Sequence, residues 1–196
     1  LIIISLPIAA GIIDLADKIV LIFKSGYSEA ILPLQIVMVS LPFIFLIFPI
    51  GSLLNACDRQ KTNTLIMAGA TVLSVIMNII LIPRFKAVGA SLTVVITNIV
   101  MFAACLSIVP KIIEYKKANI IKIFFKALFA VIVMAVSAFY LKFYVNVFLV
   151  IIVCVILYFV LLFLLGGFKK EDILSILGSF RKKQELAEIS EQERIL

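Results

Sequence analysis

Long uncharged runs, each bounded by short charged turns, constrain this chain more than any other feature of its sequence. The clearest example lies within Gly51–Thr97, where Asp58-Arg59-Gln60-Lys61 precedes 22 uncharged residues, Thr62 to Pro83. A second basic turn, Arg84-Phe85-Lys86, then leads into another uncharged run. About 20 apolar residues in a helix span the hydrocarbon core of a bilayer. The stretch therefore predicts two transmembrane helices joined by a tight polar turn.

The same pattern recurs along the whole chain and gives six apolar runs. They cover approximately residues 1–23, 30–57, 62–83, 87–110, 123–141 and 147–165. Because 64% of the residues are hydrophobic and only 15% are charged, the chain cannot cover a buried core with a charged surface. The sequence predicts an all-α integral membrane protein with six transmembrane helices.

Composition divides the chain into four regions. Residues 1–110 hold four predicted helices, residues 111–122 form a basic amphipathic linker, residues 123–166 hold two additional helices, and residues 167–196 form a polar tail. The chain begins inside an apolar run, without methionine and without the basic start of a signal peptide. We therefore expect it to be the C-terminal part of a longer protein.

The distribution of lysine and arginine predicts which ends of the helices face the cytoplasm. If the turn at Asp58–Lys61 is cytoplasmic, the basic segment Lys111–Lys126 and the tail are cytoplasmic too, and these three segments hold 13 of the 18 Lys and Arg residues. The opposite side holds four, and Lys18 lies within the membrane. The positive-inside rule then places the C-terminus in the cytoplasm.

Several classes of function are disfavoured. The net charge of +7 comes from basic residues at the ends of apolar runs, without the aromatic–basic interleaving that binds nucleic acid, so no nucleic-acid partner is expected. The chain has no histidine and no paired cysteine motif, so neither a metal site nor a cofactor is predicted. We expect Cys57, Cys105 and Cys154 to be small buried hydrophobic residues.

The first apolar run contains the strongest candidates for a functional site. It is interrupted by Asp14, Asp17 and Lys18, which would be costly if they faced lipid and should instead point into the helix bundle or an aqueous cavity. Asp14 and Lys18 are four residues apart and can pair directly on one helical face. A structural ion pair and a role in binding substrate or a coupling ion are both open readings.

Other polar or helix-breaking residues are explained by packing or bending. Pro42 and Pro49 each remove an internal hydrogen bond and predict bends in their run, whether as hinges or as ordinary kinks. Small and hydroxyl residues recur on one face from Thr64 to Asn78, which favours close helix packing.

Several motifs together resemble one transporter family. Asn78-Ile-Ile-Leu-Ile-Pro83-Arg84-Phe85-Lys86-Ala87-Val88-Gly89-Ala90 resembles the Asn-x-x-x-x-Pro-x-Tyr/Phe-Gly-x-x-Gly-Ala signature of polysaccharide-biosynthesis flippases. These flippases belong to the superfamily of multidrug, oligosaccharidyl-lipid and polysaccharide exporters. The segments 16–27, 54–61 and 166–172 resemble other parts of the same family in the same order. Lys86 departs from the pattern, since the family has glycine there, and this departure argues against a glycine-specific tight turn.

The resemblance implies a fold, a function and partners. It implies that residues 1–110 are four helices of the second lobe of a two-lobe alternating-access transporter, and that residues 123–166 are an additional pair. It further implies a flippase, not an enzyme, that moves a lipid-linked sugar across the cytoplasmic membrane of a bacterium. Its implied partners are the lipid-linked sugar, membrane lipids and a missing N-terminal lobe. In that setting Lys18 could meet phosphate oxygens, while Asp14 or Asp17 holds it in place or carries a coupling proton.

Three alternatives remain open at this stage. A cation-coupled multidrug exporter of the same superfamily would be favoured by a net acidic cavity. A membrane-embedded lipid-sugar transferase would require clustered acidic residues at the membrane face, where the chain offers only Glu171-Asp172. The third alternative is a fragment that has no activity without its N-terminal lobe.

Overall fold

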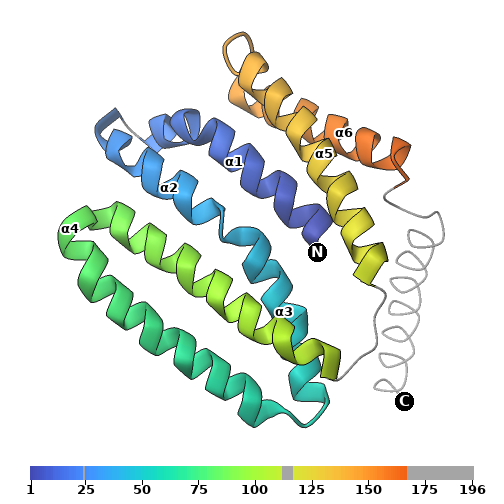
Figure 1. Ribbon diagram of the computed structural model, residues 1–196. Coiled ribbons are helices and arrows are strands. Elements are labelled where there is room, and N and C mark those ends of the chain that lie inside the picture. The colour runs from blue at the N-terminus through green and yellow to red at the C-terminus, as the bar shows by residue number, and fades with distance from the viewer. Residues whose placement is uncertain (24, 112–116, 167–196) are drawn as a thin grey trace, which may run out of the picture.

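The computed structural model describes residues 1–23, 25–111 and 117–166, and nearly all of them lie in helices (Figure 1). The elements are α1 (Ile2–Phe23), η1 (Ser25–Ala30), α2 (Ile31–Met38), α3 (Leu41–Ala56), α4 (Gln60–Ile108), η2 (Val109–Lys111), α5 (Lys117–Leu141) and α6 (Val147–Leu164). The polar tail lies outside the described residues, as do residues 112–116 of the predicted linker. Helix α5 begins at Lys117, inside the predicted linker.

Several of the helices have the length and apolar composition of membrane spans. Within the described residues, three helices qualify by length and composition, or four if the bent pair formed by η1–α2 and α3 is one span. Six spans therefore remain a prediction. The count of qualifying helices is lower than the predicted six partly because α4, with 49 residues, counts as one helix although it folds back on itself. About 20 residues suffice for one crossing.

The run from residue 30 to residue 57 forms two helices instead of one. Segments 26–38 and 41–56 meet at an angle of 41°. The break falls at Val39 and Ser40, immediately before Pro42, which lies in the first turn of α3 and has no backbone N–H to continue the earlier helix. The Ser40 hydroxyl donates a 2.7 Å hydrogen bond to the Val37 carbonyl. Pro49 lies inside α3, which continues past it to Ala56.

Helix α4 is a hairpin whose two arms run antiparallel in Figure 1. The break is at Lys86, where φ is 50° and ψ is −126°. This is a backbone conformation that glycine adopts readily and that strains a residue with a Cβ atom. The expectation that Lys86 would prevent a glycine-like tight turn is therefore wrong: the turn forms, with lysine in the strained position.

Gly89 allows the two arms of α4 to approach each other just after this turn. A Cβ atom at Gly89 would collide with the Leu81 carbonyl oxygen, would lie 2.6 Å from the Leu81 carbonyl carbon, and would lie 3.1 Å from the Ile82 nitrogen. No side chain larger than hydrogen fits there without moving backbone. This close approach gives a physical reason for glycine at position 89 of the motif.

Helices α1, α5 and α6 share the main hydrophobic core. Its buried members are Leu15, Ala127, Ala130, Val131, Met134, Ala138, Val150, Cys154, Tyr158 and Leu162. The four residues Ala127, Ala130, Met134 and Ala138 lie on one face of α5, and the three alanines let α1 and α6 pack closely against it. Helix α1 also contacts α2 and α3, so it lies between α2–α3 and the α5–α6 pair (Figure 1).

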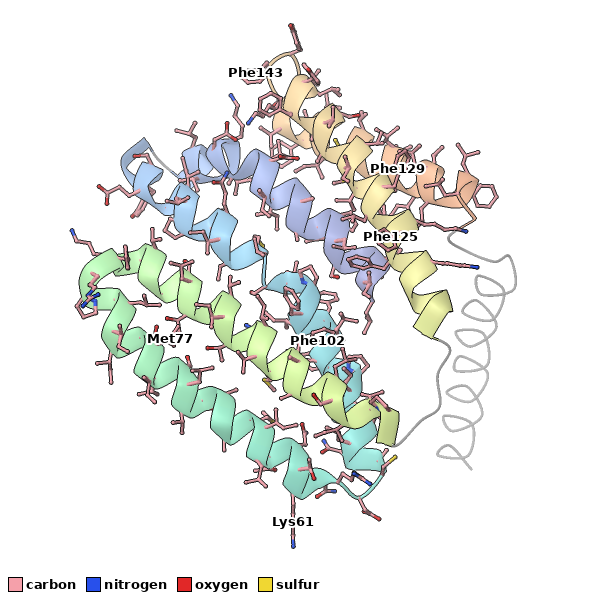
Figure 2. All side chains as sticks on the ribbon, viewed as in Figure 1. Lys61, Met77, Phe102, Phe125, Phe129 and Phe143 are labelled. Atoms are coloured by element: carbon pink, nitrogen blue, oxygen red, sulfur yellow. The ribbon has the colours of Figure 1, made fainter. Side chains whose placement is uncertain are left out.

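The turns alternate between two ends of the bundle. In Figure 1 the N-terminus, the turn between α3 and α4, and the start of α5 lie toward one end. The end of α1, the turn of α4 and the turn between α5 and α6 lie toward the other end. Figure 2 shows Lys61 extending away from the bundle at the first end, and Phe102 between α4 and α3. The Phe102 ring lies 5.7 Å from that of Phe43.

Candidate functional site

The three charged residues of α1 lie in its C-terminal half, at the end of the bundle that holds the turn between α5 and α6. Asp14, Asp17 and Lys18 are each half-buried, next to the fully buried Leu15 and Ala16. Their helix continues to Phe23 without a break. The charged groups are therefore held on a regular helix, half-buried, and not on a loop.

Lys142, in the turn that follows α5, is the partner of this cluster. Its Nζ atom lies 3.3 Å from Asp17 Oδ2 and donates a 3.2 Å hydrogen bond to the Asp14 backbone carbonyl. The Lys142 side chain is only 11% exposed, whereas that of Asp17 is 41% exposed. The ammonium also lies 5.1 Å from the Phe139 ring centre and 5.6 Å from that of Phe143. Figure 2 places Phe143 at this turn.

The predicted pairing of Asp14 with Lys18 is not present in the structure. Among the described residues, no ion pair joins Lys18 to Asp14 or to Asp17, and the one ion pair formed there is that of Asp17 with Lys142. The i, i+4 spacing makes a pair along one helix possible, but the packing of α5 against α1 brings a second lysine whose ammonium is already surrounded by acceptors and aromatic faces.

Two carboxylate oxygens of the cluster can still accept a hydrogen bond. Asp14 Oδ2 and Asp17 Oδ1 are buried atoms with no hydrogen-bond partner among the described residues. Buried polar atoms are normally satisfied, so such atoms point to a further partner. Chemically, this arrangement can accept hydrogen bonds, bind a cation or take up a proton.

A groove of about 380 Å³ runs beside the cluster between α1, α5 and α6. Its walls are apolar side chains from the three helices, and Gly11 opens it on the α1 side. A Cβ atom at Gly11 would meet nothing within 4 Å. Leu15 and Ile19, which are the sequence neighbours of Asp14 and Lys18, are among its lining residues. The chain thus combines a charged cluster with an adjacent hydrocarbon surface.

Three functional or bracing residues were missed by the sequence reasoning: Lys142, Tyr158 and Gln35. Gln35 on α2 donates a 3.0 Å hydrogen bond to the Ile13 carbonyl, and the Tyr158 hydroxyl on α6 donates one of 2.7 Å to the Ile3 carbonyl. Each was visible as a single polar group within or beside an apolar run, where a polar group needs a partner. A signal for Tyr158 also existed in Pro7, which has no N–H for the Ile3 carbonyl.

The remaining motif residues lie around the turn of α4. Asn78 is half-buried on the first arm, Pro83 and Lys86 are exposed at the turn, Gly89 is buried, and Ala90 is half-buried on the second arm. None of them lies in α1, so the structure does not bring them together with Asp14, Asp17 and Lys18 in one element. At the other end, Asn63 donates a 3.2 Å hydrogen bond to Asn55 and braces the turn between α3 and α4.

The cysteine prediction holds for two residues of three. Cys105 and Cys154 are buried, but Cys57 is exposed. Cys57 is the C-cap of α3, where the chain leaves the helix for the turn at 57–59, so it is not packed between helices. Within the residues that the structure describes, no group of three His, Cys, Asp or Glu residues could hold a metal ion.

Comparison with known proteins supports the fold. No family model and no curated protein matches the chain. Among solved structures, the chain is similar to the lipid II flippase MurJ in an inward closed conformation, with a TM-score of 0.68 and 18% sequence identity. The likeness covers 82% of this chain and 35% of the MurJ chain. The solved structure is that of a flippase, not of an enzyme, and at this identity the likeness establishes the shared fold alone.

Proposed function

We propose that this chain is part of a flippase that moves a lipid-linked sugar precursor across the cytoplasmic membrane by alternating access. The observation that carries the proposal is the likeness to the lipid II flippase MurJ over 82% of the chain. The sequence motif at Asn78–Ala90, which resembles the signature of polysaccharide-biosynthesis flippases, supports the same superfamily. A polysaccharide or oligosaccharide precursor is the substrate class that this motif favours.

In this proposal residues 1–110 supply four crossings of the second lobe and residues 123–166 supply the additional pair. The proposed six crossings are two from the antiparallel arms of α4, one from the bent span of α2 with α3, and one each from α5 and α6. The sixth is α1, whose 22 residues are long enough to cross although it is not among the helices that qualify by composition. The chain spans 35% of the MurJ chain, so transport requires helices equivalent to the remainder, which we expect from an N-terminal lobe.

The orientation follows from charge. Arg59, Lys61 and Lys122 lie toward the end of the bundle that we assign to the cytoplasm, whereas Lys142 and the turn at Arg84–Lys86 lie toward the other end. The C-terminal tail is then cytoplasmic by the positive-inside rule. The alternation of turns between the two ends of the bundle supports this assignment.

The proposed transport site is the cluster on α1. Lys18, which has no partner among the described residues, is suited to the phosphate oxygens of a lipid-linked sugar, and buried charge in membrane helices commonly marks a transport path. The accepting oxygens of Asp14 and Asp17 are suited to a coupling proton or cation. The apolar groove beside them is suited to a hydrocarbon chain, because small-molecule sites are mostly apolar with a few polar groups.

A cation-coupled multidrug exporter is the second candidate, and it is favoured by the two buried carboxylate oxygens, of Asp14 and Asp17, that have no hydrogen-bond partner among the described residues. The two functions differ in the sign of the substrate. A lipid-linked sugar phosphate is an anion that requires Lys18, whereas a cationic drug requires Asp14 or Asp17 and is repelled by Lys18.

Complementation tests the proposal. The full-length gene is expressed in a bacterial strain that lacks its own flippase, and polymer export is measured for wild type, Lys18→Ala and Asp17→Ala, with Lys122→Ala on the exposed part of α5 as the control. We expect export from wild type and Lys122→Ala, and a loss of at least about tenfold for Lys18→Ala. Normal export in both cluster variants at equal abundance contradicts the proposed site. Drug resistance without export favours the exporter.

A further inference from the structure

We propose that Lys142 is the positioning residue of the acidic cluster on α1, and that it forms the ion pair that the sequence suggested for Lys18. It fixes the Asp17 carboxylate and the backbone at Asp14, and so leaves Lys18 available to an anionic substrate. The transport part of this inference rests on the proposed function. The pairing part does not, and it can be tested on its own.

The contacts of Lys142 hold its ammonium group in one defined position. One ammonium group meets the Asp17 carboxylate at 3.3 Å, the Asp14 carbonyl at 3.2 Å, and two aromatic rings at 5.1 and 5.6 Å. The rings belong to Phe139, one helical turn earlier, and to the next residue, Phe143, and they pack edge to face at 5.7 Å. Aromatic faces attract a cation, so they hold the ammonium toward α1.

The position of Lys142 explains how α1 tolerates acidic residues. A carboxylate in a membrane helix is costly unless it is paired. Lys142 compensates one of the two carboxylates directly and comes from a different part of the chain, 125 residues away. Lys142 binds Asp17 Oδ2, and this contact holds the carboxylate in a defined direction. The other oxygen, Oδ1, has no partner among the described residues and can accept a hydrogen bond.

The difference between the two lysines then follows from their surroundings. Only 11% of the Lys142 side chain is exposed, and its ammonium group already contacts Asp17, the Asp14 carbonyl and two aromatic rings. Lys18 is half-buried one residue beyond Asp17 and has no ion-pair partner among the described residues. A substrate phosphate can therefore approach Lys18 without first breaking an ion pair, whereas binding to Lys142 would displace Asp17.

A thermal-unfolding cycle on the purified full-length protein tests the pairing. Lys142→Met leaves the Asp17 charge uncompensated, and we expect a fall in Tm of about 4 °C. The double variant Lys142→Met/Asp17→Asn removes both charges and should recover most of that fall. Lys142→Arg and the exposed-site control Lys122→Met should keep the wild-type Tm. A wild-type Tm for Lys142→Met, or a double variant no more stable than Lys142→Met, overturns the pairing.

A transport assay on the same variants tests the positioning role. Lys142→Arg should transport at the wild-type rate, because it restores the cation. Lys142→Met should lose at least about tenfold, and the double variant should stay low despite its recovered Tm, because the positioned carboxylate is absent. If the double variant regains transport together with stability, Lys142 only fastens the helices and the positioning role is wrong.

The failure of this inference can be told apart from failure of the proposed function. Wild-type transport by Asp17→Asn contradicts a transport role for Asp17, and with it the positioning role, while the Tm cycle still reports on the ion pair. Loss of transport in Lys18→Met at an unchanged Tm supports the assignment of substrate binding to Lys18 and of the structural ion pair to Lys142. A Tm for Lys18→Met as low as that of Lys142→Met contradicts it.

Discussion

Tyr158 on α6 donates a 2.7 Å hydrogen bond to the backbone carbonyl of Ile3 on α1. That carbonyl is four residues before Pro7, which has no N–H to bond it within the helix. The proline therefore opens an acceptor, and a fully buried tyrosine of another helix satisfies it. This contact and the pairing of Lys142 with Asp17 join α1 to the α5–α6 pair near both ends of α1.

The Tyr158 contact predicts a coupled mutational effect. Tyr158→Phe should lower the free energy of unfolding by about 1 kcal/mol, the usual size of a hydrogen bond between membrane helices. In a Pro7→Ala background, residue 7 regains an N–H for the Ile3 carbonyl, so the same substitution should cost less. Thermal or denaturant unfolding in detergent measures both costs. Equal costs in the two backgrounds would show that Pro7 does not create the acceptor.

The strained turn of α4 predicts that lysine is not the optimal residue at position 86. Lys86→Gly should raise the free energy of unfolding by about 1 kcal/mol, since glycine adopts a φ of 50° without a Cβ clash. Arg84→Gly is the matched control: Arg84 lies in the same exposed turn and has no positive φ. We expect the control to be neutral or destabilising. A destabilised Lys86→Gly would mean that the turn does not impose this backbone strain.

The close approach at Gly89 predicts that alanine is not tolerated there. Gly89→Ala should destabilise the protein by about 1–3 kcal/mol, because the added Cβ atom collides with backbone at Leu81 and not with a flexible side chain. Gly69→Ala, on the first arm of the same helix, meets nothing within 4 Å and should be stabilising by up to about 1 kcal/mol. The two alanine variants are compared by their Tm. Similar Tm values would contradict the tight contact between the arms.

The orientation predicts where Cys57 reacts. Cys57 is exposed at the end of α3, whereas Cys105 and Cys154 are buried, so a membrane-impermeant thiol reagent should modify Cys57 in preference to the other two. We expect modification of Cys57 in inverted membrane vesicles and none in intact cells, with Cys57→Ser as the control. Modification in intact cells would place the turn between α3 and α4 outside and reverse the topology.

The sequence predicted the local features of this fold well, for physical reasons that act over a few residues. Apolar run length predicted apolar helices, Pro42 predicted a bend where the structure has one of 41°, and the basic turn at Arg84–Lys86 marked the reversal of α4. These features depend on backbone geometry and on the cost of placing charge in lipid. The sequence did not reveal that Lys86 adopts a strained backbone conformation. The turn that strains it is required by the close contact between the two arms of α4, and that contact is not visible in the local sequence.

The candidate site was predicted only in part. Asp14 and Asp17 were identified because charges in an apolar run are conspicuous, and their spacing suggested only that Lys18, on the same helix, could pair with Asp14. The actual partner of Asp17 is Lys142, which follows α5 and meets α1 where the two helices pack together. Side-chain spacing along one helix cannot report a contact of that kind, which depends on how the helices pack.

Reconstitution of the purified full-length gene product into proteoliposomes tests the central claim most directly. A fluorescent lipid-linked sugar is placed in both leaflets, and its exposure on the outer surface is followed for wild type, Lys18→Ala and protein-free vesicles. We predict rapid exposure of the inner-leaflet pool by wild type and a rate at least about tenfold lower for Lys18→Ala. Exposure by wild type no faster than in protein-free vesicles would contradict the proposal that this protein is a lipid-linked sugar flippase.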